Sequence, residues 1–362
     1  MVASSAGVVI VGGGLAGSLL ALELRELGAA VTLIDAAAGD GSVSATAISY
    51  GAIPGWPLAA TPLARLAAGA SRRWRGLQRR HGPLGWQPRA LRLHGPNPWL
   101  HALGRLGVLP FAQVDTASLS RRLPEVLAAA GVTLRSTTAE AIRPQGRGWL
   151  VALRDGTSAQ ADQLVLAAGA RCRELWPDLP KRLRCSWAAV LELGLFPKDR
   201  ERHAAWLPQG FTRLALERRA LELQESSWVV DPGLVPWGSG ALLGQHTWIA
   251  PGGEAVPPPP ADGSARQLRE ALAEAGMDGG IATGVLRQAA VAFCTHGGPL
   301  VQPVAAAPGL WLFTGFSGGF AQVPVLAPLL AQRLVGSGQR AARAQRRLQQ
   351  LGVWPMGADS GS

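Results

Sequence analysis

The sequence predicts an α/β fold in two parts, a parallel sheet flanked by helices and a separate antiparallel sheet. Its 362 residues exceed what one hydrophobic core usually supports. Apolar runs at 8–11 and 31–34 enclose a glycine turn and a helical pattern over 18–28, which is the strand, turn, helix and strand of a βαβ unit. Between residues 186 and 250, short apolar and polar runs alternate, as they do in antiparallel sheets.

The remaining elements follow from composition and periodicity in chain order. Residues 56–106 are rich in Arg, Trp and Pro and are expected to be irregular, and the last dozen residues are expected to be frayed. A polyproline spacer at 257–260 separates the antiparallel region from a helix. The expected helices are 118–130, 265–275, a segment ending near 335, and 339–350; the expected strands are 132–136, 149–154, 163–166, 227–230, 241–244 and 310–314.

The composition excludes a disordered chain, because 48% of the residues are apolar and 16% are charged. Only two of the 35 basic residues are lysines, so the net charge of +11 reflects a general excess of arginine. We therefore expect no nucleic-acid partner. Arginine clusters at 72–80 and 340–347 are interpreted as solvated faces, although a patch for nucleic acid or anionic lipid is an alternative.

Cysteine content and hydropathy indicate in which cellular compartment the protein is expected. The chain has three cysteines, an odd number, and they are widely spaced: Cys172, Cys185 and Cys294. This pattern indicates neither a disulfide framework nor a metal site, and it favours a cytoplasmic protein. The apolar stretch 7–22 is interrupted by three consecutive glycines and followed by charged residues, so we expect no transmembrane segment.

The turn after the first strand matches the pattern GxGxxG that binds dinucleotides. Gly12 permits the tight turn, Gly14 lets backbone N–H groups approach a pyrophosphate, and Gly17 lets the helix pack closely on the strand. Asp35 ends the next strand, where a carboxylate accepts hydrogen bonds from ribose hydroxyls and would repel a 2′-phosphate. The predicted cofactor contacts here are Gly12, Gly14, Leu15, Ala16, Gly17 and Asp35.

NAD and FAD share this pattern, and two later segments favour FAD. Residues 161–170 form an apolar strand ending in small residues, which resembles the second motif of two-dinucleotide-fold flavoproteins but also suits an ordinary core strand. Residues 310–320 form a strand and a glycine-rich loop that leads into a helix. Such a loop places N–H donors against the carbonyl edge of a flavin ring, where they stabilise reduced flavin.

These three segments in this order resemble the glycine/D-amino-acid oxidase family of FAD enzymes, and residues 44–53 are similar to the family's segment after the ribose acid. The resemblance implies a Rossmann-like FAD-binding domain, assembled from residues 1–75, 130–180 and 283–350. Residues 76–129 and 181–282 would form the antiparallel-sheet substrate domain, and 351–362 a C-terminal tail. The further cofactor-binding residues it implies are Ala45, Thr46, Gly51, Ala168, Gly169, Gly315, Ser317, Gly318, Gly319 and Phe320.

The chain departs from the family where amino-acid oxidases bind the substrate carboxylate. The position of the family's tyrosine holds Leu234, and no arginine lies in the five residues before the turn 295–299. Arg287 is the nearest candidate for a carboxylate clamp. Tyr50, Arg287 and His296 are the candidate catalytic residues, and for His296 a surface turn is the more frequent alternative.

The resemblance favours an FAD-dependent oxidoreductase that oxidises a C–N bond of a small amine or amino acid, with oxygen or another electron acceptor reoxidising the flavin. A flavin dehydrogenase acting on a hydroxy acid or a less polar substrate is one alternative, and an FAD-binding protein without turnover is another. The sequence contains no second GxGxxG, so reduction by bound NAD(P)H is not expected. The residues leave the substrate, the acceptor and the oligomeric state open.

Overall fold

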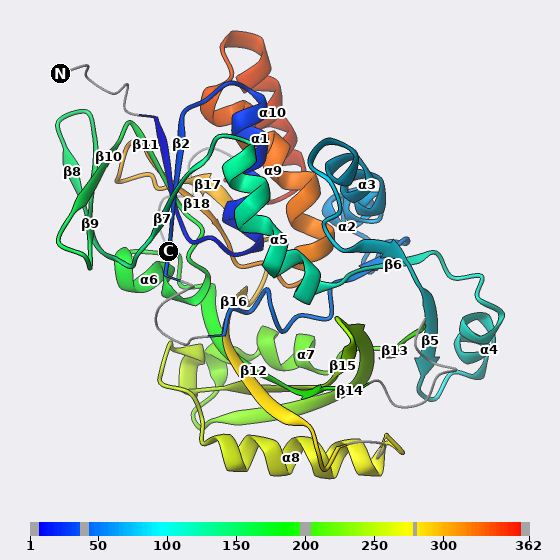
Figure 1. Cartoon of the computed structure of the whole chain (residues 1–362). Helices are drawn as coiled ribbons and strands as arrows, with labels where there is room; N and C mark the ends of the chain where they lie inside the picture. The colour runs from blue at the N-terminus through cyan, green and yellow to red at the C-terminus, as the bar shows by residue number, and fades with distance from the viewer. Residues whose placement is uncertain (1–6, 37–42, 196–203, 278–280, 356–362) are drawn as a thin grey trace.

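The computed structural model describes residues 7–36, 43–195, 204–277 and 281–355. A parallel sheet with helices beside it forms one part of the molecule, and a large antiparallel sheet with a helix along its outer face forms the other (Figure 1). Both sheets were expected, and the α/β fold class is confirmed.

The first sheet has six strands in the order β17-β18-β11-β1-β2-β7. All adjacent pairs are parallel except β17 with β18, which closes one edge in antiparallel fashion. Every residue of the central strand is buried, as expected for a parallel strand covered on both faces. The strands are β1 (Val8–Val11), β2 (Val31–Asp35), β7 (Thr133–Ser136), β11 (Gln163–Leu166), β17 (Leu300–Pro303) and β18 (Leu310–Thr314).

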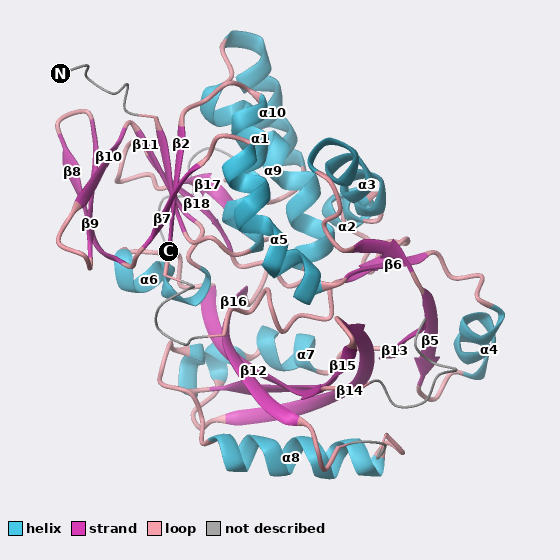
Figure 2. Ribbon diagram, viewed as in Figure 1, coloured by secondary structure: helices cyan, strands magenta, loops and turns pink. Residues whose placement is uncertain are grey.

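Helices cover one face of this sheet and a small antiparallel sheet covers the other (Figures 1 and 2). The helical side forms the largest core, in which Leu19, Leu326 and Leu330 are among the buried residues. The opposite core includes Val9, Leu164 and Trp149, the last of which comes from the small sheet. The helices are α1 (Leu15–Glu26), α3 (Ala70–His81), α5 (Thr116–Ala129), α9 (Gly319–Val335) and α10 (Gly338–Gln350); the small sheet is β8 (Ala139–Gln145), β9 (Gly148–Leu153) and β10 (Ser158–Ala161).

The second large sheet has the strand order β16-β12-β15-β14-β13-β5 and is antiparallel apart from the β13–β5 pair. Leu191 and Leu243 on one face pack with Leu268 and Leu272 of the helix α8, which lies along the sheet (Figure 2). The elements here are β5 (Ala90–His94), β12 (Leu183–Leu193), β13 (Ala204–Pro208), β14 (Ser227–Trp237), β15 (Gly240–Ile249), β16 (Val285–Cys294), α7 (Arg213–Arg218) and α8 (Ala261–Glu274), with short 3₁₀ turns at Ala220–Glu222 and Pro251–Gly253. The short helix α6 (Cys172–Leu175), which follows the 3₁₀ turn Gly169–Arg171, packs beside β8 of the small sheet.

The segment 56–106 is more regular than the sequence predicted. Thr61 and Asn97 cap two helices with their side chains, and each cap is followed by a proline in the first turn. The high Arg, Trp and Pro content of this segment suggested irregular structure, so these two helix starts were not predicted. The elements are β3 (Ala52–Pro54), α2 (Pro62–Ala67), β4 (Trp86–Pro88), α4 (Pro98–Leu106) and β6 (Phe111–Val114), and β3, β6 and β4 form a three-stranded sheet.

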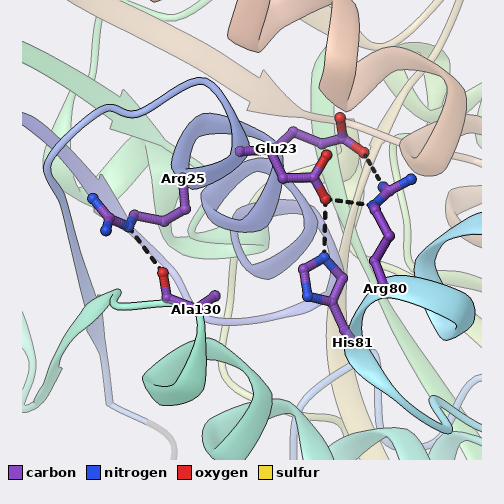
Figure 3. Close-up of polar contacts among 6 residues, drawn as sticks. Glu23, Arg25, Arg80, His81 and Ala130 are labelled. Carbon is purple, nitrogen blue, oxygen red and sulfur yellow. Dashed lines mark hydrogen bonds and ion pairs between the residues drawn. The ribbon is translucent and has the colours of Figure 1, made fainter.

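Polar contacts join helix α3 and the end of helix α5 to α1 (Figure 3). Arg80 at the end of α3 donates to Glu26 at 2.6 Å and to Glu23 at 3.4 Å, and His81 lies 3.0 Å from Glu26. Arg25 donates to the carbonyl of Ala130 after α5 at 3.0 Å. The expected boundary at residue 75 therefore cuts through α3, and α5 lies beside the parallel sheet although 76–129 was assigned to the substrate domain.

The chain after residue 350 is packed for as far as the structure describes it. Leu351 and Val353 are buried, and Val301 N–H donates to the carbonyl of Val353 at 3.2 Å. The Trp354 ring packs on Trp311 with centroids 5.6 Å apart. Residues 351–355 are thus not frayed, and 356–362 lie outside the described residues. Among the described residues, no helix is both long and apolar enough to span a membrane.

Candidate functional site

The carboxyl ends of β1, β2, β11 and β18 open into one cavity of about 1080 Å³. Val11, Asp35, Ala167 and Thr314 line it at these strand ends, and residues of the antiparallel sheet close the other side. Ligands of open parallel sheets bind in the crevice beyond the carboxyl ends of the strands, and typical pockets are roughly 300–1,000 Å³. The cavity therefore has the position and the room for a dinucleotide.

The glycine turn between β1 and α1 forms one wall of this cavity through Gly12, Gly14, Leu15 and Ala16. Gly12 has a φ of +108°, and a Cβ there would lie 2.4 Å from the carbonyl oxygen of Ala167, so only glycine fits. A Cβ on Gly14 would meet only the Oγ1 of Thr46, at 3.2 Å. The N-cap residue of α1 is Gly14, which has no side chain to cap the helix, and the first turn contains no acidic residue, which suits an anionic pyrophosphate.

The segment after Asp35 lies along the same wall. Ala45 and Thr46 line the cavity, and the Leu15 N–H donates to the Oγ1 of Thr46 at 2.9 Å. Asp35 lies on the cavity beside the glycine turn, since a Cβ on Gly13 would lie 2.7 Å from its carboxyl group. On the neighbouring strand end, Ala168 and Gly169 also line the cavity.

The glycine-rich loop after β18 meets the same cavity. Gly315, Ser317, Gly319 and Phe320 line it, and a Cβ on Gly319 would lie 3.4 Å from the Leu15 side chain. The loop leads into α9, whose N-terminus has no side-chain cap. Segments more than 290 positions apart, by the numbers of Leu15 and Gly319, thus meet at one site.

Three of the predicted cofactor residues support the cavity without lining it. Gly17 faces the backbone of Gly12, Gly51 sits in a turn against Val114 with a φ of +64°, and Gly318 is the N-cap of α9. At Gly17 and Gly51 glycine is needed for the course of the backbone, and none of the three residues lines the cavity.

The three candidate catalytic residues lie away from the cavity lining. The buried Tyr50 hydroxyl donates to the carbonyl of Gly233 at 3.2 Å, and burial, together with Asp231, raises the pKa of this phenol well above its ordinary value. His296 is exposed on the turn after β16, with its Nδ1 2.9 Å from the Oγ1 of Thr295. Arg287 donates from Nε to Glu192 at 2.7 Å.

An arginine that the sequence did not single out lines the cavity instead. Arg213 of α7 donates to Glu217 at 2.9 Å and to the carbonyl of Ser317 at 3.0 Å, so it joins α7 to the loop before α9. Glu217 also lines the cavity and is only 4% exposed. Burial raises the pKa of the Glu217 carboxyl, and the Arg213 charge opposes that shift.

Asp231 fixes the start of α7 and so positions this pair. Its carboxylate accepts hydrogen bonds from the backbone N–H and hydroxyl of Thr212, at 2.6 and 2.7 Å, and from the N–H of Arg213 at 3.1 Å. Trp187, Phe293 and Phe316 also line the cavity. A nearly buried ion pair therefore borders the cavity beside the Ser317 loop.

With this geometry in place, comparison with known proteins identifies the family. A family model described as FAD-dependent oxidoreductase matches residues 7–107 and 98–333. The chain belongs to this family of FAD-dependent oxidoreductases. It is therefore an FAD-dependent enzyme, as its glycine motifs predicted. The FAD-dependent oxidoreductase assignment also agrees with the cavity, whose glycine walls leave room for a dinucleotide.

Solved structures show the same fold at low sequence identity. Glycine oxidase from Geobacillus kaustophilus superposes with a TM-score of 0.65 and 19% identity, covering 91% of this chain and 94% of that one. Iminodiacetate oxidase from a Chelativorans species gives 0.67 and 18%, covering 91% and 96%. L-amino acid deaminase from Proteus vulgaris gives 0.66 and 14%, covering 92% and 94%. No curated protein sequence matches the chain.

Proposed function

We propose that this FAD-dependent oxidoreductase oxidises a C–N single bond of a small amine or amino acid by hydride transfer to the flavin. The observation that carries the proposal is one cavity whose lining includes both the glycine turns and the aromatic residues Trp187, Phe293 and Phe316. FAD, when bound, supplies the two-electron acceptor. The neighbours in fold are named for glycine, iminodiacetate and L-amino acids, all of which contain C–N single bonds.

The apolar walls would favour the form of an amine that can react. An amine carries a hydride-donating C–H bond next to nitrogen, and its neutral form has the lone pair that assists departure of the hydride. Transfer into an apolar site disfavours an ammonium and lowers its pKa, so Phe293 and Phe316 would hold the substrate as the free base. The same side chains exclude water from the reacting carbon.

The charged side chains that line the cavity limit the net charge that a buried substrate can carry. Each arginine that lines it is already paired: Arg213 with Glu217, Arg171 with Glu174 at 2.8 Å, and Arg154 with Glu140 at 3.5 Å. A carboxylate buried without a partner is very costly. We therefore expect a substrate that is uncharged or that holds its anionic group at the cavity mouth, and we expect simple α-amino acids to be poor substrates.

Anaerobic flavin bleaching tests the reaction class. The purified protein should be yellow, and small amines should bleach its flavin absorbance in the absence of oxygen while hydroxy acids leave it unchanged. Bleaching by hydroxy acids alone would replace the proposal with a hydroxy-acid dehydrogenase. If photoreduced flavin is reoxidised by no acceptor and no substrate bleaches it, the protein binds FAD without turnover.

Substitution of Arg287 tests the charge argument. Because the Arg287 guanidinium is bound to Glu192 and lies outside the cavity lining, Arg287→Ala should change the turnover of any amine or amino acid by less than about twofold. The measurement is steady-state kcat/KM, with Arg340→Ala on the exposed face of α10 as the control. Efficient glycine oxidation that collapses in Arg287→Ala would restore this residue as a carboxylate clamp.

A further inference from the structure

Five of the twelve large apolar side chains that are most exposed in the described residues gather around one short helix. We call them the α4 patch: Leu58, Trp99, Leu103, Leu106 and Val108. Trp99 is 79% exposed and Leu106 is 73% exposed. Leu58 lies in the loop that follows Gly55, whose N–H donates to the carbonyl of Pro110, two residues after Val108, at 2.7 Å. In Figure 1, α4 lies at the periphery, beside β5.

The α4 patch is a fixed surface. Asn97 accepts hydrogen bonds from the N–H groups of Trp99 and Leu100, and Gly107 ends the helix in a left-handed conformation. On the inner face, a Cβ on the buried Gly104 would lie 3.1 Å from the Leu93 backbone, so α4 lies close against β5. Positions 99, 103 and 106 follow a helical spacing and project from the opposite, solvent-facing side.

The charged side chains of the chain segment that carries the patch are all basic. The 74 residues from 41 to 114 contain no Asp or Glu and include nine arginines. Arg105 is exposed directly beside Leu106, and Arg92 donates to the carbonyls of Gly104 and Arg105 at the end of α4. The exposed arginines of this segment are Arg65, Arg72, Arg73, Arg75, Arg79, Arg80 and Arg105. The apolar patch therefore has Arg92 and Arg105 beside it, and the chain segment that carries it contributes no acidic side chain.

We propose that the α4 patch docks on an anionic lipid bilayer, with α4 lying in the plane of the interface. A helix that presents Trp and Leu with Arg beside them enters the boundary between headgroups and acyl chains, where Trp is enriched and Arg reaches the lipid phosphates. A second copy of the chain fits less well, since a symmetric contact would set the same segment, which has arginines and no acidic residue, against itself. A nucleic acid would leave Leu103, Leu106 and Val108 without apolar contact.

Vesicle sedimentation with the purified holoenzyme tests the proposal. The protein should sediment with vesicles of phosphatidylcholine and phosphatidylglycerol, much less with phosphatidylcholine alone, and less as salt rises, because salt screens the arginine charges. The double variant Trp99→Ser with Leu106→Ser should reduce the partition coefficient by at least about tenfold, since it removes the two most exposed apolar side chains of the patch.

The matched control is Leu195→Ser, which removes an apolar side chain outside the α4 patch that is also 79% exposed. It should leave vesicle binding unchanged, and an unaltered flavin spectrum should show that all variants are folded. Three results would overturn the proposal: no binding to anionic vesicles, binding that the double variant leaves intact, or a wild-type dimer that the double variant converts to a monomer. The last would assign the patch to a second copy of the chain.

Discussion

The Gly14→Val variant should purify without flavin. A Cβ on Gly14 would project into the cavity, where the only protein atom within 4 Å is the Oγ1 of Thr46, at 3.2 Å. A branched side chain would therefore occupy the space left for the pyrophosphate without colliding with the protein core. Visible absorbance, and FAD released on denaturation, should fall to background levels, while far-UV circular dichroism should stay that of the folded protein.

A valine at Gly263 is the control for this change. Gly263 lies in α8 on the antiparallel sheet, and a Cβ there would meet no atom within 4 Å. Gly263→Val adds the same side chain at a distance from the cavity and should keep full flavin content. Normal flavin content in Gly14→Val would show that the pyrophosphate does not lie at this turn.

The parts of the fold that sequence predicted well are those fixed by local pattern. The βαβ unit was predictable because its strands are short buried β-branched runs and Gly12–Gly17 supplies a turn that few other sequences allow. The sequence predicted the first residue of a helix less accurately. The first helix begins at Leu15 and not at residue 18, because its first turn consists of small residues of the glycine motif that carry little amphipathic signal.

The glycine positions along the cavity were predictable for a related reason. Gly12, Gly14 and Gly319 are at positions where a side chain would meet backbone or fill the cavity. The need for glycine at these positions is therefore visible in the sequence as a local motif. Tyr50 shows the limit of this reasoning. It follows the segment 44–49 along the cavity, yet its side chain turns away to hydrogen-bond Gly233, a residue 183 positions further on.

The Arg213–Glu217 side of the cavity was not predictable. Arg213 and Glu217 have the i, i+4 spacing that is common on solvated helices, and nothing local distinguishes a pair buried against a distant loop. Their position depends on Asp231 holding α7 and on the Ser317 carbonyl, contacts that arise only when the two sheets come together. Long-range packing of this kind leaves no periodicity in the sequence.

Breaking the Arg213–Glu217 pair should cost a large part of the protein's stability. Arg213→Leu leaves the nearly buried Glu217 carboxylate without its charge partner, and removal of one member of a buried pair typically costs about 3–5 kcal/mol. The free energy of unfolding, measured in urea at saturating FAD, should fall by about this amount at neutral pH. The double variant Arg213→Leu with Glu217→Leu should recover most of the loss, because no buried charge remains.

The loss in Arg213→Leu should also depend on pH in a defined direction. Burial already raises the pKa of Glu217 above its ordinary value of 4.5, and removal of Arg213 takes away the main opposing charge. A carboxyl whose pKa is higher in the folded than in the unfolded protein destabilises the fold only when ionised. The deficit should therefore be small below pH 4.5 and grow as the pH rises through the folded pKa. Arg171→Leu, which breaks an exposed pair with Glu174, should cost at most about 1 kcal/mol at every pH. An Arg213→Leu deficit that stays the same from acidic to neutral pH would show that Arg213 acts through packing alone.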